Sequence, residues 1–255
     1  MRKIVLLLMV IVFLLIGCGE EEESVRLHLP YFYDDFSLPF IDSSKWTVDT
    51  SGGGTISLAN GVATLLVNTP GGDMQSTLEF PTALVTKIRS VGVRVNPTRY
   101  FQDVPSGSNV RFRITARHYK DDQRPSGGAE SDIFSQLRIR NGQFQALVSR
   151  CDSATCNASS ILPGASITLG PVSLNRYYDM NLSYDGGTTF SFVVDGVGST
   201  VIDASNVGAF IKIGPPGAPR ALVEVQADSG APLAIGSMTA LLDHVTCIRL
   251  SYAPC

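Results

Sequence analysis

Short β-type segments separated by turn residues dominate the sequence. Runs of β-branched and aromatic residues recur roughly every eight to twelve positions, which is typical of a β-sandwich or barrel. No stretch shows a convincing amphipathic helical period. The sequence therefore predicts one all-β domain, with strands near residues 55–58, 62–67, 85–95, 110–119, 133–139, 144–149, 177–184, 190–194 and 221–227.

Tight turns join several of these segments. Asn141-Gly142 lies between two β-type runs, and Asn-Gly favours a two-residue hairpin loop because both residues tolerate a positive φ. Asp185-Gly186-Gly187 gives a similar signal further along the chain. We expect a β-hairpin at each position.

Arginine alternates with apolar residues in two predicted strands. Positions 111, 113 and 117 are Arg, on the face opposite the apolar residues of their run, and Arg138 and Arg140 share a face opposite Leu137 and Ile139. If the two strands are neighbours, these arginines form a basic strip suited to a sulfated or carboxylated polysaccharide or to an acidic protein surface. The alternative is a solvated sheet face with cross-strand charge pairs. Adding Tyr119 as a stacking platform, the candidate ligand-binding residues are Arg111, Arg113, Arg117, Arg138, Arg140 and Tyr119.

The charge balance excludes two classes of protein. The chain of 255 residues has 20 Lys and Arg against 23 Asp and Glu, a net charge of −3, and 44% of its residues are hydrophobic. A strongly basic nucleic-acid binder does not have this composition. Intrinsic disorder over most of the length is excluded because the apolar content is ample and the net charge is small.

The N-terminus has the parts of an export signal. Arg2-Lys3 precede an apolar run at 4–16, which spans only about 20 Å as a helix, less than the ~30 Å hydrocarbon core of a bilayer. The segment at 15–18 resembles a bacterial lipobox, which implies cleavage before Cys18 and acylation of that residue. Two or more acyl chains hold a protein firmly on a membrane. An ordinary signal peptide with an incidental cysteine is the alternative.

The predicted organisation follows from this signal. Residues 1–17 are a lipoprotein signal peptide, residues 18–30 are an acidic tether that contains Glu20 to Glu23, and residues 31–255 are the β domain. The protein is expected to be exported and anchored to the cell envelope. Gly19 replaces the Asp that often retains lipoproteins at the inner membrane, so the outer membrane is favoured if the source has two membranes.

Four cysteines remain after Cys18. Cys151 and Cys156 enclose one short loop, and Cys247 and Cys255 enclose another. Three pairings are possible, and we favour the two local ones as structural disulfides because the exported setting is oxidising. A metal site is a poorer reading, since the chain has no CxxC pair and only three His.

Several short motifs resemble those of concanavalin A-like lectin/glucanase domains. They lie at both ends of the predicted domain, at 33–36, 41–46, 57–65, 184–196 and 242–245. The resemblance implies a two-sheet antiparallel jelly roll whose concave sheet binds glycans. It also implies a structural Ca²⁺ ion near Asp35, a carbonyl close to Gly61, and Asp243; oxygen ligands suit this ion. Alternatively, Asp35 and Asp243 are turn and edge residues without a metal.

The glucanase branch of this family carries carboxylates in the pattern E-x-D-x-x-E. Glu130 and Asp132 match the first two, but Ser135 stands where the last Glu is required, so a retaining mechanism lacks its second carboxylate. The sequence predicts a lipid-anchored cell-envelope module that binds a carbohydrate, with an anionic glycan favoured, or that mediates adhesion. The alternatives are a divergent glycoside hydrolase using Glu130 and Asp132, and a structural envelope lipoprotein without a glycan site.

Overall fold

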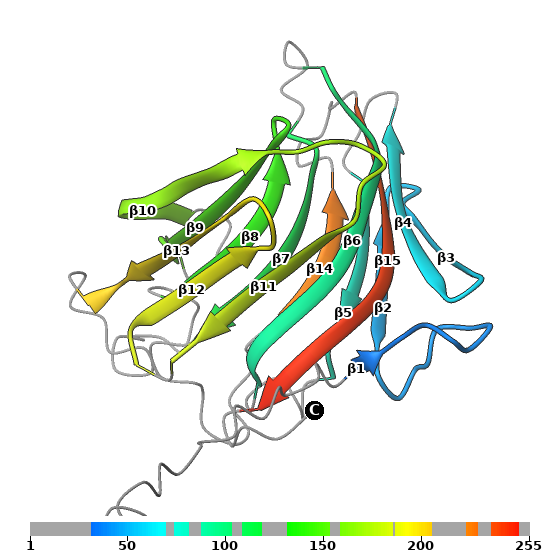
Figure 1. The fold of residues 1–255 in the computed structure, drawn as a ribbon, viewed down its shortest axis with the longest axis horizontal. Coiled ribbons are helices and arrows are strands. Elements are labelled where there is room, and N and C mark those ends of the chain that lie inside the picture. The colour runs from blue at the N-terminus through cyan, green and yellow to red at the C-terminus, as the bar shows by residue number, and fades with distance from the viewer. Residues whose placement is uncertain are drawn as a thin grey trace, which may run out of the picture. The chain divides into compact units, whose positions relative to one another are not determined.

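A computed structural model describes residues 32–69, 74–81, 88–103, 109–118, 132–153, 159–185, 187–205, 223–228 and 236–249. These residues lie within a compact unit, Tyr31–Cys255. They form two antiparallel β-sheets and contain no α-helix (Figure 1). No helix in this described part of the chain is long and apolar enough to cross a membrane. The predicted all-β sandwich is therefore confirmed.

The strands divide between two sheets, and hydrogen-bonded neighbours run antiparallel. In spatial order, sheet A contains β13 (Gly198–Asp203), β12 (Thr189–Val194), β11 (Tyr178–Tyr184), β6 (Ile88–Gln102), β15 (Gly236–Arg249), β4 (Val62–Thr69) and β3 (Thr55–Ala59), and β1 (Phe32–Asp34) also pairs with β15. Sheet B contains β10 (Ser159–Pro171), β9 (Gln143–Cys151), β8 (Ile133–Arg140), β7 (Arg111–His118), β14 (Val223–Asp228), β5 (Gln75–Glu79) and β2 (Thr47–Ser51).

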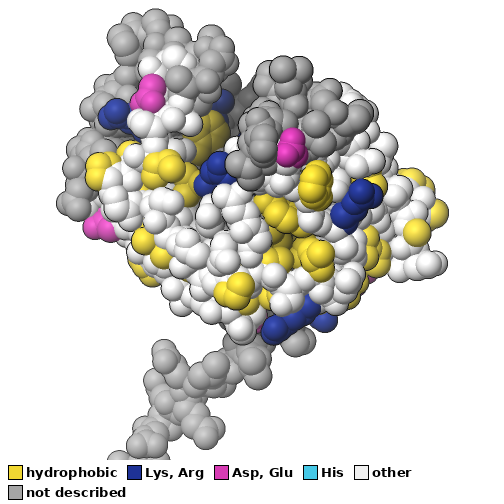
Figure 2. All heavy atoms as spheres, turned by 90° about the horizontal axis from the view of Figure 1, so that it is seen from above, with side chains coloured by type: hydrophobic (Ala, Val, Ile, Leu, Met, Phe, Trp, Pro, Cys, Tyr) yellow, Lys and Arg dark blue, Asp and Glu magenta, His cyan; other side chains and the backbone are white. Residues whose placement is uncertain are grey.

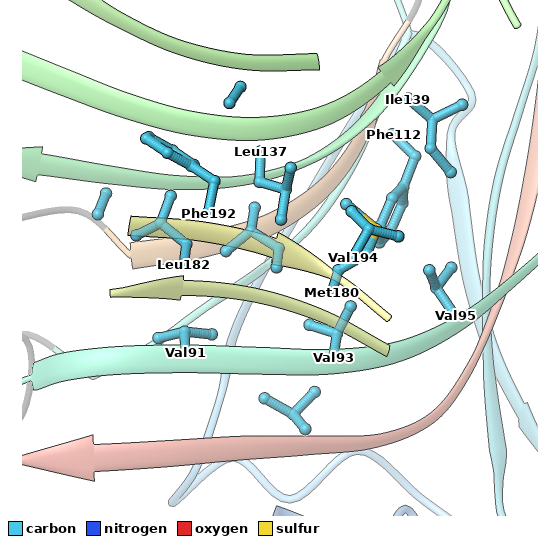
Figure 3. Packing of buried hydrophobic residues seen from close by; sticks show 14 of the residues in the cluster. Val91, Val93, Val95, Phe112, Leu137, Ile139, Met180, Leu182, Phe192 and Val194 are labelled. Carbon is cyan, nitrogen blue, oxygen red and sulfur yellow. The ribbon is translucent and has the colours of Figure 1, made fainter. Parts of the chain in front are cut away.

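The hydrophobic core fills the space between the two sheets. Alternate side chains of each strand point inward, as a period of two requires. Sheets A and B face each other through buried valine, leucine, isoleucine, methionine and phenylalanine side chains (Figure 3). The labelled examples are Val91, Val93, Val95, Met180, Leu182, Phe192 and Val194 from sheet A, and Phe112, Leu137 and Ile139 from sheet B.

Both predicted hairpins are present. Asn141 and Gly142 have φ angles of 52° and 67° between β8 and β9, the positive values that a type I′ turn requires. Between β11 and β12, the Asp185 carboxylate accepts hydrogen bonds from the backbone N–H groups of Gly187 (2.7 Å) and Thr189 (3.1 Å). Each turn thus fixes the register of the strands that it joins.

The segment after β1 is organised around a buried carboxylate. Asp34 accepts hydrogen bonds from the Trp46 indole N–H (2.6 Å) and the Phe36 backbone N–H (3.0 Å), and the Lys45 ammonium lies 3.5 Å away. Trp46 in turn packs edge-on against Phe80, with ring centroids 4.8 Å apart. This arrangement fixes the start of the domain against the core.

Each predicted strand segment overlaps an observed strand, but several strands were not predicted. The clearest example is β10, in which Pro163 and Gly164 interrupt the run and most side chains are exposed on both faces. Its pairing with β9 shifts register between Ile161 and Ser166, and Gly164 has a φ of 73°. A bulged edge strand of this kind has no clean alternation, so its sequence gives no strand signal.

The outer surface mixes apolar and charged side chains. On the face seen from above in Figure 2, hydrophobic side chains form several separate groups, with Lys, Arg, Asp and Glu between them. Such dispersed apolar groups are usual for a folded protein surface. The charge pattern of the sheet faces is therefore more informative about a binding site than this view.

Candidate functional site

The two arginine-bearing strands are direct neighbours. In the register of β7 with β8, Arg111 stands opposite Arg140 and Arg113 stands opposite Arg138. Arg117 stands opposite Phe134 in the same ladder. The basic strip was predicted on the condition that these two strands are neighbours, and they are. The arginine strip is the name used below for Arg111, Arg113, Arg117, Arg138 and Arg140.

The arginine strip lies on the face of sheet B that points away from the core. On β7 its members alternate with fully buried Phe112 and Ile114, and on β8 they alternate with Leu137 and Ile139. Side chains directly opposite each other in an antiparallel pair have Cβ atoms only about 5 Å apart, and like charges there are destabilising. Two opposed Arg pairs therefore require nearby groups that accept their hydrogen bonds.

Polar neighbours provide part of this compensation. The Arg138 Nε–H donates to Gln145 Oε1 on β9 at 3.1 Å, and the Arg138 residue is only 6% exposed. On the other side of β7, the register places Asp228 of β14 opposite Arg111 and Gln226 opposite Arg113. This register is compatible with the alternative of cross-strand charge pairs. The Nε of Arg140 is buried and has no hydrogen-bond partner.

The same face contains buried polar residues that the sequence analysis did not select. Gln136, Thr115, Ser149 and Thr77 are all less than 9% exposed although they belong to the outward-facing set. The hydroxyl oxygens of Thr115 and Thr77 have no hydrogen-bond partner, and leaving such a group unsatisfied costs about 1–3 kcal/mol. The alternation of Gln143 and Gln145 with apolar residues in β9 was the sequence signal that would have extended this face.

Asp132, one of the two candidate catalytic carboxylates, forms a buried ion pair. Its carboxylate is fully buried and its Oδ2 accepts from Arg117 Nη2 (2.8 Å) and Nε (3.0 Å). The Asp132 carbonyl accepts the Cys151 backbone N–H at 2.8 Å. Glu130 and Tyr119 lie outside the described residues. The second carboxylate of the predicted catalytic pair, Glu130, is therefore not described.

The position of the missing third carboxylate faces the core. Ser135 is fully buried, and its hydroxyl lies 3.3 Å from His118 Nε2. The His118 ring packs against Tyr184 and Phe190, at centroid distances of 4.7 and 5.1 Å, and burial lowers its pKa to about 3. This imidazole is therefore neutral at ordinary pH and belongs to the packed interior, away from the arginine strip.

Both carboxylates of the predicted calcium site contact other groups of the protein. The Asp35 carboxylate accepts the Ser37 N–H at 3.1 Å, and the hydrogen bonds of Ser37 keep the pKa of Asp35 below its usual value. The Asp35 carbonyl lies near Gly61, but the Asp243 carboxylate is 3.5 Å from Arg94 Nε and 3.4 Å from His244 Nδ1. Calcium takes six to eight oxygens, whereas no group of three or more His, Cys, Asp or Glu among the described residues is arranged to hold a metal. Calcium binding stays a prediction.

The cysteine predictions are only partly within the described residues. Cys151 and Cys247 are disulfide-bonded and almost completely buried. Cys156, Cys255 and the lipidation residue Cys18 lie outside the described residues. The pairing of the cysteines and the acylation of Cys18 therefore stay predictions.

Solved structures identify the fold. The κ-carrageenase of Pseudoalteromonas carrageenovora, in complex with an oligotetrasaccharide of κ-carrageenan, matches with a TM-score of 0.56 at 10% identity, over 85% of this chain and 92% of that chain. The protein BuGH16Bwt matches with a TM-score of 0.52 at 9% identity, over 84% and 90% of the two chains. The fold is the concanavalin A-like jelly roll. No family model and no curated protein matches the sequence.

The jelly roll predicted from the short motifs is therefore confirmed as a fold. A third similar structure, the carbohydrate recognition domain of Emp46p, has a TM-score of 0.49 at 12% identity, over 85% of this chain and 95% of that chain. At these identities the likeness concerns the fold alone, and a fold hosts many functions. The function of this jelly roll has to be argued from its own side chains.

Proposed function

We propose that this protein is a lipid-anchored carbohydrate-binding module of the cell envelope that binds an anionic glycan on the outer face of sheet B. The observation that carries the proposal is the presence of two directly opposed arginine pairs in the β7–β8 ladder, Arg111 with Arg140 and Arg113 with Arg138. They concentrate positive charge on one face of a protein whose net charge is −3.

An anionic ligand would complement the positive charge of this face. Arginines at directly opposed positions of a ladder bring like charges close together, and a bound sulfate or carboxylate adds a negative charge beside them. Arginine suits this role because its planar fork makes two parallel hydrogen bonds to such a group. Gln143 and Gln145 of β9, which are partly exposed on the same face, supply amide groups of the kind that bind sugar hydroxyls.

The similar solved structures support a glycan as the ligand class by analogy of fold. The κ-carrageenase was solved with an oligosaccharide of κ-carrageenan, and it matches this chain over most of both lengths. Carbohydrate binding by this jelly roll is thus inferred from two grounds, the fold that it shares with these structures and the chemistry of the arginine strip.

The side chains favour binding over hydrolysis. A retaining glycosidase needs two carboxyl groups about 5–5.5 Å apart. Asp132 is fully buried in its ion pair with Arg117, and the position that would carry the further carboxylate is Ser135, on the core side of β8. The face that carries the arginines is therefore proposed to hold a glycan without cleaving it.

The membrane part of the proposal rests on the sequence. The apolar run at 4–16 followed by Gly17-Cys18 resembles a lipoprotein signal, and the acidic segment at 20–23 would separate an acylated Cys18 from the domain. Mass spectrometry of the mature N-terminal peptide tests it directly, since acylation of Cys18 adds the mass of the lipid.

A glycan array tests the ligand class. Sulfated and uronic-acid polysaccharides are expected to bind, and the corresponding neutral polysaccharides are not. Arg140→Gln removes one guanidinium from the strip, and losing a charge-assisted hydrogen bond on a partly exposed residue is expected to weaken binding about tenfold. Arg94→Gln is the matched control, because Arg94 lies on sheet A. Binding of neutral glycans only, or equal loss in both variants, would contradict the proposal.

A further inference from the structure

The loop between β1 and β2 presents an apolar tip to solvent. Leu38 is 43% exposed, Phe40 is 60% exposed, and Pro39 between them is also exposed. We call Leu38, Pro39 and Phe40 the apolar tip. Single exposed apolar residues are common, but three consecutive ones on a folded domain indicate a function or an unfavourable surface.

The loop is fixed at both ends, so the exposure of the tip is built into the fold. Phe36 and Trp46 flank the tip, both are 2% exposed, and their rings stack with centroids 6.3 Å apart. Asp34 accepts hydrogen bonds from both residues. Within the loop, the Asp42 carbonyl accepts the backbone N–H groups of Lys45 (3.0 Å) and Trp46 (2.9 Å). With its ends anchored in the core, the loop keeps the tip turned to solvent.

The apolar tip is also close in sequence to the predicted anchor. Cys18 to residue 31 comprises fourteen residues, after which β1 begins at Phe32, itself 56% exposed. Fourteen residues reach at most about 50 Å even when fully extended. An acylated Cys18 would therefore keep the first described strand and the loop after it near the bilayer surface.

We propose that the apolar tip inserts into the interfacial region of the bilayer that carries the lipid anchor. The inference rests on the anchor in the proposed function. Phe and Leu side chains bind at this depth by burying apolar area. The nearby Asp35 and Asp42 are acidic, so attraction to anionic lipids does not contribute, and the contact is expected in zwitterionic bilayers and to be insensitive to salt.

Tryptophan fluorescence in proteoliposomes tests the proposal. The chain has one tryptophan, Trp46, which is buried and provides a constant background. Phe40→Trp places a second indole on the tip, and Val201→Trp places one at a 64%-exposed position on β13, an edge strand of sheet A. The protein is expressed from the full-length sequence, purified after signal-peptide cleavage, and reconstituted into phosphatidylcholine vesicles with or without brominated acyl chains. Mass spectrometry verifies the acylation of Cys18.

Quenching of the added indole decides the outcome. The Phe40→Trp protein is expected to lose a large part of its added emission in brominated vesicles, at low and at high salt, whereas Val201→Trp matches the unmodified protein. Acylated protein with no quenching at position 40, or with equal quenching at 40 and 201, overturns the inference and leaves the anchor intact. Absence of the acyl mass overturns the anchor and the inference together.

Discussion

Neutralising Asp132 separates a structural role of this carboxylate from a catalytic one. The Asp132 side chain is fully buried and the Arg117 side chain is 23% exposed, with 2.8 Å between Oδ2 and Nη2. Asp132→Asn keeps the shape of the side chain and removes its charge. The guanidinium of Arg117 then loses the counter-charge of Asp132 at a mostly desolvated position.

The expected cost is large for a single substitution. Removing one partner of a buried ion pair costs about 3–5 kcal/mol. Because part of the Arg117 side chain reaches solvent, water recovers some of this loss, and we expect the free energy of unfolding to fall by about 2–3 kcal/mol. Denaturant unfolding followed by Trp46 fluorescence measures the change. The control is Asp179→Asn, an exposed carboxylate on β11, for which the change should stay within about 0.5 kcal/mol.

A double-mutant cycle with Arg117→Gln identifies the partner. If the ion pair is the source of the effect, the two substitutions together cost less than the sum of the single changes, with a coupling of roughly 1–3 kcal/mol. An Asp132→Asn protein as stable as the unmodified one, or more stable, would refute this reasoning. Active-site groups often reduce stability, so that result would favour a catalytic carboxylate.

Three further predictions concern the framework of the fold. Burial lowers the pKa of His118 to about 3, below its ordinary value of 6.5. The free energy of unfolding is therefore highest above pH 6.5, and it falls by up to about 1.4 kcal/mol per pH unit as the pH drops from 6.5 towards 3. The unfolding free energy of His118→Phe should depend less on pH in this window. Gly142→Ala, at a φ of 67°, should lower the free energy of unfolding by about 1 kcal/mol in denaturant titrations. Trp46→Phe removes the 2.6 Å hydrogen bond to buried Asp34, and should lower the free energy of unfolding by about 2–3 kcal/mol, measured by circular dichroism because the variant has no tryptophan.

Most of what could be predicted about the fold came from the alternation of apolar and polar residues along the strands. Strand β7 and the second half of β8 alternate cleanly, so both their existence and the outward direction of their arginines follow from sequence. Strand β10 could not be predicted, since its bulge and its exposure on both faces remove the pattern. The hairpin at Asn141-Gly142 was predictable because only a few residues tolerate its positive φ angles.

The candidate site was predictable only in part. Sequence assigns each arginine to a face of its own strand, but it does not say that β7 and β8 are neighbours or that Arg111 meets Arg140. It also does not show that Asp132 is buried against Arg117, because that contact depends on the folded ladder. Strand pairing is non-local information, and the chemistry of the outer face of sheet B depends on it.

Arginine side-chain NMR during a titration is the most direct test of anionic glycan binding at the arginine strip. A sulfated oligosaccharide is added to the protein, and the Nε–Hε resonances are followed, with the resonance of Arg140 assigned by Arg140→Gln and that of Arg94 by Arg94→Gln. The Arg140 resonance is expected to shift in a saturable manner, because Arg140 belongs to the arginine strip of sheet B, and the Arg94 resonance on sheet A is expected to stay in place. Saturable shifts that spare Arg140 and the rest of the arginine strip, or no shift with any sulfated or carboxylated oligosaccharide, would contradict the account.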